Sequence, residues 1–417
     1  MQYICVTETT PISTRAADDL GPGPLAGMRV VELGQLVAAP YCGQLLGDLG
    51  AEVVKIEDPN GGDPMRQWGR QKPDGHSLWW SVVGRNKKSV CVDLRRPEGQ
   101  DLVRRLVAQA DVVVENFRPG TLERWGLGYD RLSADNPGLV LARITGFGQT
   151  GPYSGRAGYG SIGEAMGGLR YVVGDPSAPP SRVGIAIGDT LAAVFAAMGV
   201  MSALIERDRT GRGQIVDAAI YESVFAVMES LIADYEIGGQ VRERSGSFLP
   251  DVAPSNVYPC ADGTQVLLAA NQDTVFRRLA KAMGEPGLAT DPRYATHNAR
   301  GARQAELDRR IAAWTATMPW ERLDEICQEH GVPAGIMFRA PEMLADPHFR
   351  AREAIVRVAH PYFGDVPMQN VFPRLSRTPG EVKWAGPELG RHTDEVLTRL
   401  GVDAADVARL RREGVLR

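Results

Sequence analysis

The sequence predicts an α/β protein: a large domain built on a doubly wound parallel sheet, followed by a smaller α+β domain. Short apolar strands alternate with helices from Met28 onward, which is the pattern of repeated β–α units. After about Leu231 the pattern changes to a hairpin and clustered helices. The dipeptide Asp262-Gly263 marks the turn of that hairpin, because it favours tight β-turns.

The first β–α–β unit follows directly from its residue types. Residues 29–33 form an apolar strand pattern, and 51–56 form a second one. Between them, Pro40 predicts the start of a helix, because proline suits the first helical turn. Gly50 predicts the end of that helix after Leu49.

The remaining elements follow the same reasoning. Further strands are expected at 89–94, 111–115 and 139–144, with an amphipathic helix at 97–110. The apolar run 191–205 predicts a buried core helix, since it is too short to read as a membrane span. The second half predicts a hairpin at 257–268 and helices at 273–283, 302–317, 320–330, 388–400 and 404–413.

Composition narrows the class of protein. The chain has 417 residues, is 43% hydrophobic and carries a net charge of −4, so neither nucleic acid nor a membrane is an expected partner. Its five cysteines are scattered, without a metal-binding pattern, so no metal is expected and a reduced cytoplasmic location fits best. Residues 1–24 lack the features of a signal peptide and are interpreted as a tail.

Three polar turns are expected where ligands bind doubly wound sheets, beyond the carboxyl ends of the strands. They are residues 34–40, 116–120 and 146–152. None carries the G-x-G-x-x-G pattern that cradles a dinucleotide, so a nicotinamide-dependent dehydrogenase is disfavoured.

Asp189 is the leading candidate for covalent chemistry near those turns. It lies in the segment 184–190, just before the apolar run, so the simplest interpretation is an N-cap that accepts backbone hydrogen bonds. A capped carboxylate stays ionised, which is also the state of a carboxylate nucleophile. No histidine lies between His76 and His297, and no G-x-S-x-G serine motif is present, so other nucleophiles lack their usual partners.

Basic residues cluster around the third expected strand. This cluster is interpreted either as a solvated rim or as a phosphate-binding patch, for which arginine is well suited. Its members are Arg66, Arg70, Arg85, Lys87, Lys88, Arg95 and Arg96.

An ordered series of motifs, beginning near residue 25, resembles the family III CoA-transferases. This family includes formyl-CoA:oxalate and crotonobetainyl-CoA:carnitine CoA-transferases and is related to α-methylacyl-CoA racemase. The matching segments are Gly27–Gly34, Ala38–Pro40, Leu49–Glu57, Asn86–Ser89, Val114–Gly120, Gly146–Pro152 and Thr210–Asp217.

The resemblance implies a Rossmann-like large domain, a smaller inserted α+β domain and an interlocked homodimer. The expected divisions are a tail at 1–24, the large CoA-binding domain at 25–230, a linker and small domain at 231–350, and a returning segment at 351–417. The family's Gly-Asp motif places its aspartate nucleophile at Asp189. Acyl-CoA and a small carboxylic acid are the implied substrates.

The resemblance also implies the residues that contact coenzyme A. They are Val37, Ala38, Arg95, Asn116, Phe117, Arg124 and Tyr159. Two positions depart from the family pattern. Asp58 replaces an arginine expected to contact phosphate, and Gly160 replaces an acidic residue after the aromatic position. Any assisting carboxylate must therefore come from elsewhere or be dispensable.

The predicted activity is transfer of CoA from an acyl-CoA to a free acid through aspartyl anhydride and aspartyl-CoA thioester intermediates. A racemase remains the alternative enzyme, although its Gly-His-Asp motif aligns with Gly158-Tyr159-Gly160. A catalytically silent acyl-CoA-binding protein is the non-enzymatic alternative. Residues 244–248 are expected to form a mobile lid, because they contain Gly246.

Overall fold

The computed structural model describes residues 23–70 and 72–417 and divides into two compact units. The first unit comprises Met1–Gly167, Ala186–Glu229 and Arg350–Arg417, and the second comprises Gly168–Ile185 and Ser230–Phe349. Apart from residues 23 and 24, the expected tail lies outside the described residues. The second unit also takes residues 168–185, which the predicted boundaries assigned to the large domain.

The first unit is built on the predicted parallel sheet, which is confirmed. Its six strands run in the order β3-β2-β1-β4-β5-β6, and every neighbouring pair is parallel. The strands are β1 Arg29–Glu32, β2 Glu52–Glu57, β3 Lys87–Cys91, β4 Val112–Glu115, β5 Val140–Thr145 and β6 Ile215–Ala219. The sequence reading missed β6, whose residues are more polar and more exposed than those of the central strands.

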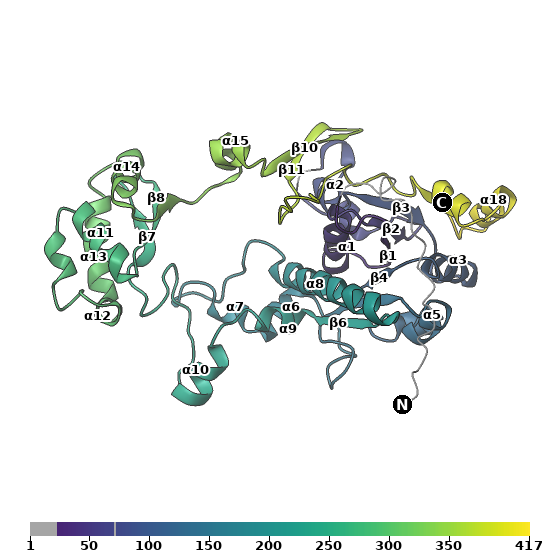
Figure 1. Cartoon of the computed structure of the whole chain (residues 1–417), viewed down its shortest axis with the longest axis horizontal. Coiled ribbons are helices and arrows are strands. Elements are labelled where there is room, and N and C mark those ends of the chain that lie inside the picture. Colours follow the sequence, from purple (N-terminus) through teal and green to yellow (C-terminus); the bar gives the residue numbers. More distant parts are fainter. Residues whose placement is uncertain (1–22, 71) are drawn as a thin grey trace, which may run out of the picture. The chain divides into compact units, whose positions relative to one another are not determined.

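Helices cover both faces of this sheet (Figure 1). On one face, α1 (Ala38–Asp48) and α8 (Ile187–Thr210) bury small apolar side chains against the strands. The opposite face is covered by α3 (Pro97–Val107), α5 (Tyr129–Asp135), α17 (Thr393–Arg399) and α18 (Ala404–Arg412). Burial on both faces explains why the strands read as continuous apolar runs.

Two predicted helix starts need correction. The first helix begins at Ala38 and not at Pro40, and Val37 is its N-cap residue. The start of α8 lies before Asp189, at Ile187, with Ala186 as the N-cap residue. Asp189 is therefore the third residue of α8, and the prediction that it caps the helix is wrong.

The long helix α8 is apolar along most of its length. By length and composition it is the one helix within residues 23–70 and 72–417 that is able to cross a membrane. In the structure 44% of its most apolar window is buried. Ala192, Ala196 and Val200 face the sheet and are fully buried, as in the core helix of an α/β protein. The sequence prediction of a core helix fits this packing.

The second unit has its own antiparallel sheet and apolar core. Its sheet runs β7-β8-β9, with β7 Ser255–Pro259, β8 Gln265–Ala269 and β9 Ala334–Ile336. The predicted hairpin turn lies between β7 and β8. Helices α11 (Asp273–Ala282), α13 (Gln304–Thr315) and α14 (Trp320–His330) contribute to the same core.

The remaining elements connect these layers. The first unit also holds a two-stranded antiparallel hairpin, β10 Ile355–His360 with β11 Gly364–Gln369. The shorter helices are α2 Leu78–Val83, α4 Thr121–Arg124, α6 Gly160–Met166, α7 Leu169–Val172, α9 Ile220–Phe225, α10 Leu231–Gly238, α12 His297–Gly301, α15 Ala340–Ala345 and α16 Pro347–Ala351, and single 3-10 turns are η2 Pro64–Gln67, η3 Pro73–Gly75 and η4 Pro286–Ala289.

Candidate active site

Asp189 lies in the first turn of α8 with its side chain partly exposed. A negative charge at this end of a helix interacts favourably with the helix dipole and with the free backbone N–H groups, by about 0.3–1 kcal/mol. The position therefore favours the ionised carboxylate. It also supplies backbone donors near any oxyanion formed at this carboxylate.

Gly160 lies directly against the carboxylate of Asp189. A Cβ atom built on Gly160 would stand 2.3 Å from Oδ2 and 2.8 Å from Cγ of Asp189. No side chain fits at that separation unless the carboxylate moves. The departure from the family pattern at this position therefore lets the first residue of α6 approach Asp189 at backbone distance.

Glu164 is a buried carboxyl group one helical turn after Gly160. It is 2% exposed, and a Cβ atom on Gly188 would lie 3.2 Å from its Cγ. Sequence reasoning missed this residue. The available signal was the spacing of four residues, which places Gly160 and Glu164 on one face of α6.

Val37 ends the turn between β1 and α1 as the N-cap residue, whereas Ala38, also expected in this turn, is the first residue of α1. Asn116, at the end of β4, holds this turn through both polar atoms of its amide. Its Oδ1 accepts a 2.8 Å hydrogen bond from the N–H of Gln35, and its Nδ2 donates a 2.8 Å bond to the carbonyl of Gln35. Asn116 therefore fixes the backbone of this turn through two hydrogen bonds.

A buried charged side chain also fixes the middle of this turn. Leu36 has a φ of +65°, a left-handed conformation that is unusual for a leucine. Asp63 accepts a 3.0 Å hydrogen bond from the N–H of Leu36, and it also accepts one from Met65. Asp63 in turn pairs with the Lys55 ammonium at 2.8 Å, with both side chains fully buried.

Two lysines hold backbone carbonyls at the start of this turn and in the first turn of α1. Lys55 donates to the carbonyl of Gly34 at 2.8 Å, and Lys87 donates to the carbonyl of Pro40 at 2.5 Å. The carboxylate of Glu32 forms an ion pair with each lysine, with an N···O distance of 2.8 Å in both. Burial lowers the pKa of Lys87, whereas the surrounding carboxylates raise the pKa of Lys55 despite its burial. The turn is thus fixed at four backbone positions before any ligand binds.

Arg95 follows β3 and is engaged by two carboxylates. Its Nη2 lies 3.1 Å from Oδ2 of Asp58, and its Nε lies 2.7 Å from Oδ1 of Asp93. The side chain of Arg95 is 59% exposed, so it remains accessible to a ligand. Asp58, the second departure from the family pattern, therefore acts on a residue expected to contact phosphate.

Three other expected contact residues have different surroundings. Phe117 packs edge-on against Trp125, with ring centroids 5.1 Å apart, and is partly buried. Arg124 is exposed and donates a 2.9 Å hydrogen bond to the hydroxyl of Thr121. Tyr159 is 64% exposed at the start of α6, so its ring is accessible to a ligand.

The parallel sheet arranges these residues along one edge, beyond the carboxyl ends of its strands. Arg95 follows β3, while Asn116 and Phe117 follow β4, three positions away in the strand order. At ~4.8 Å per strand, this separation is roughly 14 Å. Tyr159 ends the loop after β5 and adjoins Gly160 and Asp189. The sheet does not gather the residues around one point; an extended ligand is needed to reach all of them.

The interpretation of the basic cluster as a phosphate patch or a solvated rim is wrong for Arg85 and Lys87. Arg85 pairs with Asp48 at 2.6 Å and Lys87 with Glu32, and both cations are buried. Lys88 forms an ion pair with Glu52 at 2.8 Å. Internal ion pairs account for these residues, because buried charges need partners.

The predicted lid, residues 244–248, belongs to the second unit. The Arg244 side chain donates a 3.1 Å hydrogen bond to the carbonyl of Tyr171. The N–H of Gly246 donates a 3.1 Å hydrogen bond to the carbonyl of Gly174. The motion expected of residues 244–248 stays a prediction.

Among residues 23–70 and 72–417, no group of three or more His, Cys, Asp or Glu side chains is arranged to hold a metal ion.

The fold and the site together define a doubly wound α/β protein with an extended ligand edge. At one end of that edge stands a carboxylate, Asp189, on a helix N-terminus and against a glycine backbone. This arrangement is suited to a long ligand whose reactive group reaches the carboxylate.

The model of CoA-transferase family III matches residues 25–393, so the chain belongs to this family. It is 58% identical over 396 residues to a succinyl-CoA–D-citramalate CoA-transferase of Chloroflexus aurantiacus, covering 95% of this chain and 98% of that protein. It is 40% identical to the alpha subunit of a succinyl-CoA–L-malate CoA-transferase of Chloroflexus aurantiacus, covering 94% and 92%.

The fold agrees with a solved structure. A crystal structure of a CAIB/BAIF family protein from Brucella suis matches with a TM-score of 0.81 and 36% sequence identity, covering 91% of this chain and 100% of that one. The family and the enzyme class predicted from the sequence, a CoA-transferase that uses CoA thioesters, are confirmed. The individual contact residues stay predictions.

Proposed function

We propose that the enzyme transfers CoA from succinyl-CoA to a hydroxylated dicarboxylic acid of the citramalate or malate type. The names of the two Chloroflexus aurantiacus relatives, at 58% and 40% identity, support this donor and this acceptor class. The near-complete coverage of both relatives supports applying the reaction to the whole chain.

The reaction proceeds through covalent intermediates on Asp189. Its ionised carboxylate attacks the thioester carbonyl of succinyl-CoA, and the C–S bond breaks to release CoA thiolate and leave a mixed anhydride. The thiolate then attacks the Asp189 carbonyl, which releases succinate and leaves an aspartyl-CoA thioester.

The second half repeats these steps in reverse order. The acceptor carboxylate attacks the aspartyl-CoA carbonyl, which forms a second anhydride and again releases thiolate. The thiolate attacks the acceptor's carbonyl, giving the new acyl-CoA and regenerating ionised Asp189. No proton transfer is needed at any step, so this mechanism requires no acid–base residue.

The contact between Gly160 and Asp189 carries this proposal. A Cβ at residue 160 would come within 2.3 Å of the carboxylate, so glycine leaves the space into which an anhydride or thioester oxygen projects. A racemase instead needs an acid–base group across the substrate's α-carbon. The corresponding residues here are Tyr159 and Gly160, so the histidine and the aspartate of the racemase motif are both replaced.

We also propose that the active form is the homodimer and that it resides in a reduced cytoplasm. An exposed apolar stripe on α8 supports a protein partner: Val194 is 45% exposed, Met198 54% and Ile205 65%. The four cysteines in the described ranges are free and buried, which is compatible with a reducing compartment. Light scattering on the native protein tests the dimer, and a monomer at working concentration contradicts it.

A substrate panel with intact-mass spectrometry tests the reaction. Succinyl-CoA with citramalate or malate should give the new acyl-CoA, and succinyl-CoA alone should leave a CoA adduct on Asp189. Asp189→Ala should lose both. Asp208→Ala is the matched control, because Asp208 lies on the same helix with its side chain 66% exposed. Turnover without any adduct, or an active Asp189→Ala enzyme, contradicts the covalent mechanism.

A further inference from the structure

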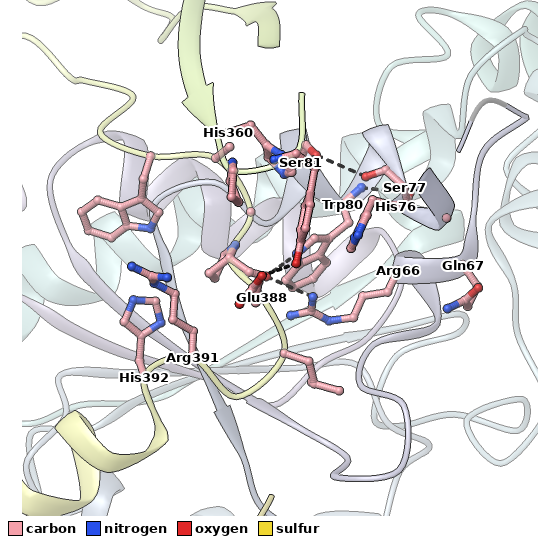
Figure 2. A pocket seen from close by; sticks show the side chains of 18 of the residues that line it. Arg66, Gln67, His76, Ser77, Trp80, Ser81, His360, Glu388, Arg391 and His392 are labelled. Carbon is pink, nitrogen blue, oxygen red and sulfur yellow. Dashed lines mark hydrogen bonds between the residues drawn. The ribbon is translucent and has the colours of Figure 1, made fainter. Parts of the chain in front are cut away.

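A cavity of about 900 Å³ lies within the first unit, apart from the candidate active site (Figure 2). Segments far apart in the sequence form it: the loop after β2, the start of α2, the corner between β10 and β11, and residues 384–392. Neither Asp189 nor any residue expected to contact CoA lines it. Its volume lies in the range of small-molecule binding sites.

The cavity borders the carboxyl end of β2 and the outer side of β3, the edge strand of the sheet. Arg66, on one wall, forms an ion pair at 2.7 Å with Glu57, the last residue of β2. His392, on another, accepts a 3.2 Å hydrogen bond from the N–H of Ser89 in β3. Ligands of parallel sheets bind beyond the carboxyl ends of the strands, which makes the position beside the end of β2 favourable for a site.

The charged side chains of the lining are mostly cationic. They are Arg66, Arg391 and Arg417, against the single carboxylate side chain of Glu388. The donors of Arg66 are already used by Glu57 and by the carbonyl of Pro387. No ion pair joins Arg391 or Arg417 to a carboxylate within the described ranges. These two guanidinium groups are therefore available to an anion.

The histidines of the lining add a donor and flat surfaces. Because Nδ1 of His392 accepts from Ser89, the proton of its neutral ring is on Nε2, and Figure 2 places this ring beside Arg391. On the opposite side, His76 stacks on Tyr362 with centroids 3.7 Å apart and an interplanar angle of 14°. Tyr362 also donates a hydrogen bond to Glu388, which holds that carboxylate at the aromatic wall.

We propose that this cavity binds a small organic oxyanion, with Arg391 and Arg417 holding its charged oxygens and the His76–Tyr362 pair covering its carbon skeleton. Guanidinium groups bind carboxylate and phosphate oxygens equally well in geometry, so both anion types share this recognition. The site is additional to the transfer reaction, because it is formed by none of that reaction's residues.

Calorimetric titration of the full-length protein with succinate and, separately, with inorganic phosphate tests the site. Arg391→Gln and Arg417→Gln should each weaken binding by about tenfold or more, since each removes a charge-assisted hydrogen bond. Both side chains are exposed, so the variants should fold. Arg412→Gln is the matched control: it is an exposed arginine near the same end of the chain that does not line the cavity.

The outcomes separate the anion types and the two sites. Binding of succinate alone identifies a carboxylate site, binding of phosphate alone a phosphate site, and binding of both a general oxyanion site. Binding should persist in Asp189→Ala, so failure of the proposed transfer reaction leaves this result intact. Saturable binding that is equal in the wild type and both lining variants overturns the proposal, as does the absence of binding by either anion.

Discussion

The amide of Asn116 exchanges two hydrogen bonds of 2.8 Å with the backbone of Gln35, one in each direction. A residue expected to contact CoA thus also holds the backbone of the turn after β1. It joins the end of β4 to the turn after β1, and these two strands are neighbours at the centre of the sheet. The ligand edge therefore depends on side chains that hold its turns as well as on those that reach the ligand.

Asn116→Ala should raise the KM for the acyl-CoA with a smaller effect on kcat, because the turn loses two hydrogen bonds but Asp189 is untouched. The free energy of unfolding should fall by about 1–3 kcal/mol. Steady-state kinetics and urea unfolding measure the two effects. Asn116→Asp keeps only the acceptor and should give an intermediate stability; a wild-type KM in both variants contradicts this function.

Gly160→Ala should lower kcat by about a hundredfold or more, since the new methyl group displaces the Asp189 carboxylate. Gly155→Ala is the matched control, because a Cβ at Gly155 meets nothing within 4 Å. Stopped assays with succinyl-CoA, together with thermal unfolding, compare the two variants. Equal kcat values for them would show that the contact has no catalytic consequence.

Asp63→Asn should destabilise the protein by about 3–5 kcal/mol, because it leaves the buried Lys55 ammonium with one carboxylate fewer. The same change weakens the hold on Leu36, so CoA affinity should fall in the fraction that folds. Urea unfolding and CoA titration measure these effects. A double-mutant cycle with Lys55→Met provides the control, and purely additive effects would argue against the pair.

Asp58→Asn should lower the KM for acyl-CoA several-fold, because it removes a carboxylate that competes with phosphate for Arg95. The difference from wild type should shrink as salt concentration rises, since both charges are partly exposed. Asp101→Asn, which breaks the exposed pair with Arg104, serves as the control. An unchanged or raised KM in Asp58→Asn indicates that Arg95 needs its carboxylate for positioning.

Burial lowers the pKa of His392, so protonation opposes folding. The folded pKa lies below the unfolded one, so the contribution to stability is present above the unfolded pKa of about 6.5 and is lost as pH falls. His392→Asn keeps an acceptor for the Ser89 N–H but does not titrate. Thermal unfolding between pH 7.5 and 5.5 should show a smaller loss for the variant; parallel curves would assign the loss to other groups.

The sequence predicted the central strands well because burial on both faces gives them uninterrupted apolar runs. The sequence analysis did not predict β6. Ile215 is 42% exposed and Asp217 interrupts the apolar residues, so this strand lacks the continuous apolar run of the central strands. The predicted start of α8 was also too late. Asp189 resembles an N-cap by residue type, but the Ile-Gly pair before it is already helical, and only the backbone conformation distinguishes these cases.

Asp189 was singled out first from its place before the apolar run, and the family's Gly-Asp motif then gave the same position. The expected CoA contacts came from the family motifs alone, and the roles of all these residues stay predictions. The hold of Lys55, Lys87 and Asp63 on the first turn was not predictable, because these residues lie far from the turn in sequence and read as surface charges. Only the folded structure shows that their charges are buried together beneath it.

Residues 415 and 416 pair with the segment that directly follows β3, the edge strand of the sheet. Leu416 bridges to Val92 beside β3, and the carbonyl of Val415 accepts a 2.9 Å hydrogen bond from Asp93. During synthesis, the apolar face beneath α17 and α18 stays uncovered until these helices leave the ribosome. The second unit lies in the sequence between parts of the first unit, so it leaves the ribosome before α17 and α18. Loss of α17 and α18 would therefore expose the apolar side chains that these helices bury together with α3 and α5.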